Sequence, residues 1–262
     1  MMMSSIFMRT LYDKRWFCIG WAIALSVMSI LMISMYPSLH DGMKSIAATM
    51  PPQLQGLVGD ISMFGHLDTY LSSQLYDIRI PLFLMIMALV LAQNLTVGAE
   101  ERGEMRTILS THTSRSSLFL QTFFAACVIF FVALLSTVAV NLVGVPLIGE
   151  SIELSLVLKL AFLSWMFAVT MFAIVYSVGA AFGSRTFVMA IGVGLIILSI
   201  ILEAGRTVDW LELAQKISLL HYYDAGKLLT TGLNLKHFAV LCILLFGTSL
   251  IGWVQFRRRD IA

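Results

Sequence analysis

Six long apolar runs, almost free of charged residues, constrain this chain more than any other feature. A helix needs about 20 apolar residues to cross roughly 30 Å of hydrocarbon. The runs extend over Trp16 to about Tyr36, Ile80 to about Ala99, Leu118 to about Val143, Lys159 to about Phe182, Thr186 to Leu202, and His237 to Phe256. The shorter fifth run leaves open a broken or re-entrant segment. The pattern predicts an all-α membrane protein: one transmembrane domain over residues 1–262, with six transmembrane helices.

The composition agrees with a lipid environment. Of the 262 residues, 59% are hydrophobic and 12% are charged, whereas a soluble domain carries about 25% charged residues. A protein core of this size cannot bury the excess, so lipid must cover it. The net charge of +2 gives no reason to expect a nucleic-acid partner. Cys18, Cys127 and Cys242 lie in apolar runs without metal-ligand spacing, and we interpret them as packing residues.

The basic residues predict the orientation. With both termini on one side, that side holds Arg9, Lys14, Arg15, Arg102, Arg106, Arg115, Arg185, Arg257, Arg258 and Arg259. The opposite side then holds Lys44, Arg79, Lys159, Arg206, Lys216, Lys227 and Lys236. Because Lys and Arg are enriched in cytoplasmic loops, we expect a multi-pass protein of the cell (plasma) membrane with both termini in the cytoplasm.

Three segments outside the runs are predicted to lie on the membrane surface. Residues 1–15 alternate apolar and basic side chains and predict an interfacial helix, with a frayed tail as the alternative. In 37–79, short outer-surface helices are predicted from the spacing of Leu54, Leu57, Val58 and Ile61. In 203–236, an amphipathic helix is predicted from Trp210, Leu211, Leu213, Ala214 and Ile217. The sequence His-Tyr-Tyr at 221–223 suits the headgroup boundary.

The polar stretch between the second and third runs, residues 98–115, is the candidate functional site. Its charged residues are Glu100, Glu101, Arg102, Glu104, Arg106 and Arg115. Within it, Met105, Ile108 and Leu109 form an apolar stripe at helical spacing. Such a helix docks in a groove of a soluble partner or rests on lipid, and the sequence leaves both interpretations open. We call residues 98–115 the coupling segment.

Several kinds of chemistry have no sequence signal. The chain contains no G-x-x-x-x-G-K-[ST] phosphate loop, no H-E-x-x-H and no G-x-S-x-G. We therefore expect no ATP hydrolysis, no enzyme activity and no cofactor in this chain. Acidic residues and histidines are almost missing from the middle of the runs, which disfavours a proton relay. The energy source for any transport is then expected on another chain.

The coupling segment resembles the region after the second span in type-2 ABC exporter permeases. The resemblance lies in Glu100-Glu101-Arg102-Gly103, Ile108-Leu109-Ser110-Thr111 and Ser114-Arg115. His112 stands where the family often has Pro. Weaker similarity to the branch linked to drug or antibiotic export covers Met50-Pro51, Leu54, Leu57, Gly59, Tyr70-Leu71, the segment Ser218 to Tyr223 and the ending Phe256 to Asp260.

The resemblance implies a permease subunit that pairs with a second permease subunit, as a homodimer or heterodimer, in membrane lipid. ATP-binding-cassette ATPase subunits would bind ATP and Mg and drive export of a hydrophobic or amphipathic substrate: a drug, antibiotic, peptide or lipid. The residues implied in ATPase coupling are Glu100, Glu101, Arg102, Gly103, Glu104, Met105, Ile108, Leu109 and Arg115.

Two other classes of function remain open. A membrane-embedded lipid-modifying enzyme would need acids and histidines at one membrane face, and the candidates are Asp60, His66, Asp68 and Asp77. An accessory membrane subunit without a transport path would carry the same charged inner loop.

Overall fold

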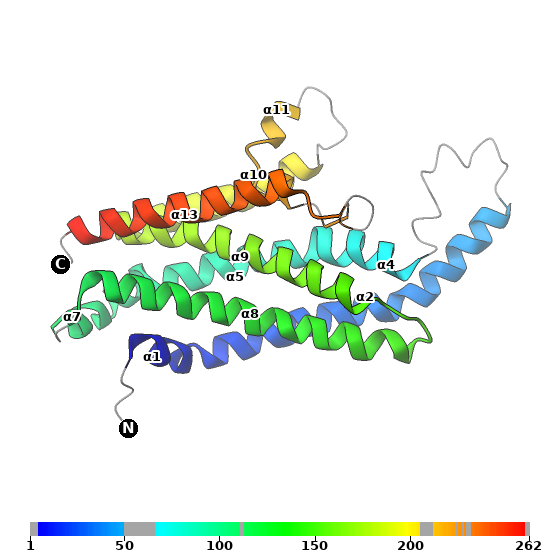
Figure 1. Cartoon of the computed structure of the whole chain (residues 1–262), viewed down its shortest axis with the longest axis horizontal. Coiled ribbons are helices and arrows are strands. Elements are labelled where there is room, and N and C mark those ends of the chain that lie inside the picture. Colours follow the sequence, from blue (N-terminus) through cyan, green and yellow to red (C-terminus); the bar gives the residue numbers. More distant parts are fainter. Residues whose placement is uncertain are drawn as a thin grey trace.

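In the computed structural model, the chain is a bundle of long helices (Figure 1). The structure describes residues 5–49, 66–110, 113–204, 212–223, 225–226, 228 and 232–259, and these contain no strand. Within this part of the chain, six helices are long and apolar enough to span a membrane. The predicted class, an all-α membrane protein with six candidate spans, is confirmed.

Eight helices make up the long helical runs of the described residues. They are α2 (Arg15–Thr49), the continuous run α4 (Leu67–Tyr70), η2 (Leu71–Arg79) and α5 (Ile80–Leu95), then α8 (Arg115–Leu147), α9 (Leu154–Phe182), α10 (Arg185–Ala204) and α13 (Leu235–Arg258). Short helices complete the described part: α1 (Ile6–Asp13), α6 (Val97–Glu101), α7 (Glu104–Leu109), α11 (Glu212–Gln215) and η4 (Leu220–Tyr222). The fifth span, α10, is one unbroken helix.

The spans run in alternating directions, which brings α1, α7 and the C-terminal end of α13 to one end of the bundle (Figure 1, left). We call this the basic end, because Arg102, Arg115 and Arg259 lie there. The start of α4 and the turn between α8 and α9 lie at the opposite, far end.

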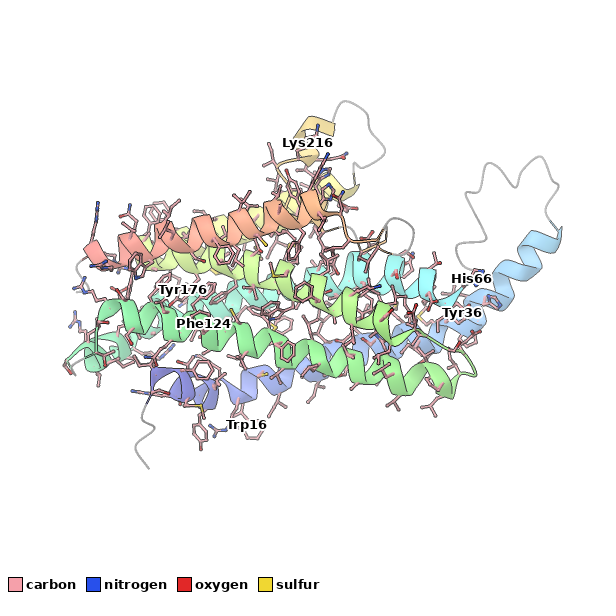
Figure 2. The ribbon with its side chains drawn as sticks, in the orientation of Figure 1. Trp16, Tyr36, His66, Phe124, Tyr176 and Lys216 are labelled. Carbon is pink, nitrogen blue, oxygen red and sulfur yellow. The ribbon has the colours of Figure 1, made fainter. Side chains whose placement is uncertain are left out.

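Helix α9 is the centre of the bundle and packs against α5, α8, α10 and α13. Its aromatic residues Phe167, Phe172 and Tyr176 are buried. On the outward faces of the other helices, side chains such as Trp16, Phe124 and Phe246 are more than half exposed. Figure 2 shows Trp16 projecting away from the bundle, whereas Tyr176 lies inside it. Outward apolar faces of this kind require a hydrocarbon environment.

The segment 37–79, where short outer-surface helices are predicted, is described at 37–49 and 66–79, and both of these parts continue the neighbouring spans as helix. Helix α2 continues past Tyr36 to Thr49, and the second span begins at Leu67 rather than Ile80. The two extensions pack on each other: the rings of Tyr36 and Tyr70 lie 5.3 Å apart, and the Tyr70 hydroxyl lies 3.8 Å from the Met32 sulfur. Leu54, Leu57, Val58 and Ile61 fall in 50–65, outside the described residues.

The headgroup level of residues 221–223 stays a prediction, but Tyr223 is buried in the bundle and does not face lipid or water. Its hydroxyl lies 2.8 Å from Ser164 Oγ and donates to the carbonyl oxygen of Tyr76 at 2.7 Å. That carbonyl lies in the π-helix η2, where the N–H of Ile80 donates to the carbonyl oxygen of Leu75, five residues earlier. The next residue, Pro81, has no N–H. The Tyr76 carbonyl therefore has no helical donor, and Tyr223 supplies one. Trp210 and Leu211 lie outside the described residues.

Gly252 sets the distance between α9 and α13. A Cβ placed on Gly252 would lie 2.7 Å from Ser177 Cα, so the two helices meet almost backbone to backbone. Close approach through small residues is how helices associate in lipid.

We predict that Gly252→Ala destabilises the bundle by about 1–3 kcal/mol, because the added methyl group overlaps the α9 backbone. Thermal unfolding in mild detergent measures the effect. The matched control is Gly247→Ala on the same helix, where a Cβ meets nothing within 4 Å. Equal melting temperatures for the two variants would contradict the tight α9–α13 contact.

Candidate functional site

The coupling segment follows a sharp break in the second span. Helix α5 ends at Leu95, and Thr96 has the non-helical backbone angles φ −108° and ψ −96°. The Thr96 side chain packs directly on Gly179 of α9, where a Cβ would overlap the Thr96 hydroxyl. Gly103 then adopts a left-handed conformation with φ 71°, which favours glycine, and separates α6 from α7. The break and this turn carry the charged helices across the basic end.

An ion pair between Glu100 and Arg259 anchors the segment. The Arg259 guanidinium donates to both carboxylate oxygens of Glu100, and the two side chains are only 16–19% exposed. The other amino group of Arg259 donates to the carbonyl oxygen of Ala180 at 3.3 Å. Gly183 packs against this guanidinium, in a space that any larger residue would fill. The pair therefore joins α6, the end of α9 and the end of α13.

Arg115 strengthens this junction from the start of α8. Its guanidinium donates to the backbone carbonyl oxygens of Arg257, at 3.4 Å, and of Arg259. Carbonyl groups at a helix C-terminus lack partners within the helix, and a cation there is favourable. Both ends of the coupling segment are thus attached to the last span.

Two further ion pairs of the described residues are more exposed. Arg102 donates to Glu104 at 2.5 Å and to the carbonyl oxygen of Asn94 at 3.2 Å. The carboxylate of Glu104 raises the pKa of Arg102. Glu101 and Arg185 lie 3.8 Å apart, with both side chains more than half exposed. Exposed pairs of this kind contribute about 0–1 kcal/mol.

The apolar stripe of α7 faces its own chain. Met105 is 6% exposed, and Ile108 and Leu109 pack against the core. Neither a partner groove nor lipid is needed to cover Met105. The exposed side chains of this helix are those of Arg106 and Thr107, followed by Ser110. The segment thus offers a partner a polar surface, and the coupling roles of the nine predicted residues stay a prediction.

Arg259 is the residue of this site that the sequence did not single out. It lay within the basic ending, and no short-range pattern links it to Glu100. Thr111 and His112 lie outside the described residues.

Three of the four candidate residues of a lipid-modifying enzyme, His66, Asp68 and Asp77, lie in the part of the chain that the structure describes. Asp60 lies outside the described residues, and His66 is exposed before α4. The Asp77 carboxylate accepts from the backbone N–H of Gly226 at 3.4 Å. Among the described residues, no three His, Cys, Asp or Glu side chains are placed to share a metal ion.

A search against protein-family models and a search of curated proteins both find no match for this chain.

We predict that Glu100→Gln or Arg259→Gln destabilises the protein by about 2–4 kcal/mol, because each leaves a largely buried charge without its partner. The double variant loses less than the sum of the single variants, since the two residues are coupled. Thermal unfolding in detergent measures all three. The control is Glu101→Gln, which removes an exposed pair and costs under about 1 kcal/mol. If Glu100→Gln and Arg259→Gln each destabilise the protein no more than Glu101→Gln does, the Glu100–Arg259 pair is not an anchor.

Proposed function

We propose that this chain is the transmembrane permease subunit of a type-2 ABC exporter, driven by ATP hydrolysis on a separate subunit. One observation carries the proposal: ion pairs, hydrogen bonds and close contacts join the charged segment after the second span to the spans around it. It contacts α13 through Glu100 and Arg115, α9 through Thr96 next to it, and α10 through Glu101. A push on this segment would move several spans together, as coupling requires.

The orientation that we propose places the basic end in the cytoplasm. The predicted inner cations lie at span ends on this side, including Arg15, Arg115 and Arg185. This distribution follows the positive-inside rule. ATP is available on that side only, so the coupling segment then faces the compartment where an ATPase works.

The contact surface that we propose consists of Glu101, Arg106, Thr107 and Ser110, which are exposed. Mg and ATP would bind the partner ATPase. A second permease subunit, identical or different, would complete the path for a hydrophobic or amphipathic substrate. The support for the partners and substrate class is the family resemblance of residues 100–115 and the missing phosphate loop.

We predict the orientation from cysteine accessibility. In a chain whose Cys18, Cys127 and Cys242 are replaced by Ala, Ser110→Cys is protected from a membrane-impermeant maleimide in intact cells and reacts after permeabilisation. Lys216→Cys, an exposed position after α11, reacts in intact cells. The reverse labelling pattern would place the basic end outside and exclude ATPase coupling there.

We predict that Arg106→Glu reduces recovery of a co-expressed ATPase at least tenfold in a mild-detergent purification, because it reverses a charge on the proposed contact surface. The side chain is exposed, so the melting temperature stays close to the wild type. Arg258→Glu is the control, an exposed cation at the same end but outside the surface. Wild-type protein that carries no stoichiometric ATPase would contradict the proposal itself.

A further inference from the structure

A cavity of about 390 Å³ lies at the basic end, between α1 and the coupling segment. Its volume falls in the range of about 300–1,000 Å³ that is typical of small-molecule sites. Helices α1, α5, α6, α7, α8, α9 and α13 all contribute lining residues. It is distinct from the proposed ATPase surface, because Glu101, Arg106, Thr107 and Ser110 do not line it.

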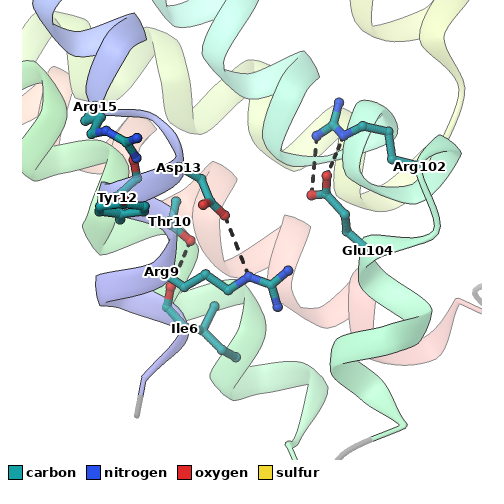
Figure 3. A network of polar contacts seen from close by, with 8 residues as sticks. All are labelled: Ile6, Arg9, Thr10, Tyr12, Asp13, Arg15, Arg102 and Glu104. Carbon is teal, nitrogen blue, oxygen red and sulfur yellow. Dashed lines mark hydrogen bonds and ion pairs between the residues drawn. The ribbon is translucent and has the colours of Figure 1, made fainter. Parts of the chain in front are cut away.

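The polar rim of the cavity carries a net positive charge. Its cations are Arg9, Lys14 and Arg102, and its carboxylates are Asp13 and Glu104. Arg9 pairs with Asp13 at 3.6 Å on α1, and Arg102 pairs with Glu104 at 2.5 Å. Figure 3 shows these two pairs on the two elements that border the cavity. Lys14 remains, and it makes no ion pair among the described residues.

Lys14 is poised to receive an anion. Burial, and secondly the nearby positive charge of Arg102, lower the pKa of its ammonium group, against a smaller opposing effect of the Glu104 and Asp13 carboxylates. The two larger effects disfavour the charged form, and a bound anion at the cavity rim would offset both. The position of Lys14 at the cavity rim and the net positive charge of the rim therefore both favour a negatively charged ligand.

The deeper lining suits the remainder of an amphiphile. Leu95, Leu118 and Phe256 supply apolar surface, and Thr122 and Tyr176 supply hydroxyl groups. An acidic group joined to a hydrocarbon portion would match this lining, in which the Tyr176 hydroxyl already donates to the carbonyl oxygen of Phe119 at 3.3 Å.

The level of the cavity in the membrane fits such a ligand. Lys14 directly precedes the first span, and the flanking aromatic rings of Tyr12 and Trp16 are exposed. The Arg15 guanidinium lies over the Tyr12 ring at 3.7 Å from its centroid. Exposed aromatic and basic side chains at a span end mark the headgroup level.

We propose that this cavity binds the phosphate headgroup of an anionic amphiphile, with Lys14 as the main contact to the anion and α1 as one wall of the site. The occupant to which we commit is an anionic phospholipid of the membrane leaflet at the basic end. The site joins α1 to the coupling segment, so an occupied cavity fastens the first span to the charged segment after the second. This inference does not require an ATPase, because binding is a property of this chain alone.

The test is a titration of the full chain, purified in neutral detergent, with thermal unfolding as the readout. Dioleoyl phosphatidylglycerol raises the melting temperature at concentrations where dioleoyl phosphatidylcholine does not. Lys14→Gln weakens the apparent Kd for phosphatidylglycerol about ten- to a hundredfold, the usual effect of losing a charged contact, and Lys14→Arg retains binding. Arg258→Gln, which removes an exposed cation at the same end but outside the cavity, binds as the wild type does.

A second measurement separates binding from structure. Without lipid, Lys14→Gln melts no lower than the wild type, because Lys14 has no ion-pair partner to lose among the residues that the structure describes. Weaker lipid binding together with undiminished lipid-free stability supports the site. Lipid-free destabilisation by this substitution would instead assign Lys14 a structural role and overturn the proposal.

Three further outcomes overturn it as well. Equal stabilisation by both lipids would remove the preference for an anion. If Lys14→Gln and Arg258→Gln weaken binding of phosphatidylglycerol equally, the lipid is attracted to the basic surface in general and not to the cavity. Inorganic phosphate or glycerol 3-phosphate acting at the same concentration as the lipid would identify a soluble phosphate and exclude the amphiphile.

Discussion

The structure depends on one constraint: a backbone in hydrocarbon must satisfy its hydrogen bonds internally. A regular α-helix satisfies its backbone hydrogen bonds within the helix itself, except at its ends. In η2 the pattern changes, and Pro81 removes the N–H that the Tyr76 carbonyl would use. The hydroxyl of Tyr223, far along the chain, donates to that carbonyl instead. One irregular turn in the second span thus explains why part of the segment between α10 and α13 is buried in the bundle.

The helices end near the ends of the apolar runs except where α2 and the second span continue past them at the far end. At the basic end, predicted and observed boundaries agree closely, because charged residues such as Arg15, Glu101 and Arg185 limit how far an apolar run can continue. At the far end, α2 and the second span continue as a helical pair held by Tyr36 and Tyr70. That contact is between protein surfaces, so the change from apolar to mixed sequence no longer marks a helix end.

The density of charged residues located the candidate site in the sequence. The contacts that its residues make could not be predicted. An apolar stripe indicates that a helix buries one face, and it does not indicate against which surface. In the structure the chain itself covers Met105. The Glu100–Arg259 pair could not be predicted either, because a basic residue near a span end usually faces lipid headgroups and water. Gly183 has no side chain, and the space this leaves allows the Arg259 guanidinium to turn inward and meet Glu100.

The Glu100–Arg259 contact also sets an order of events during biosynthesis. The two residues are 159 positions apart in the sequence. At about 5–20 residues per second, a ribosome needs roughly 8–32 s to synthesise the chain between them. Throughout this interval the carboxylate of Glu100 is without the cation that later covers it, and the groove beside Gly183 is unfilled. A protein that binds the basic end before the last helix inserts therefore meets a different surface from one that arrives afterwards.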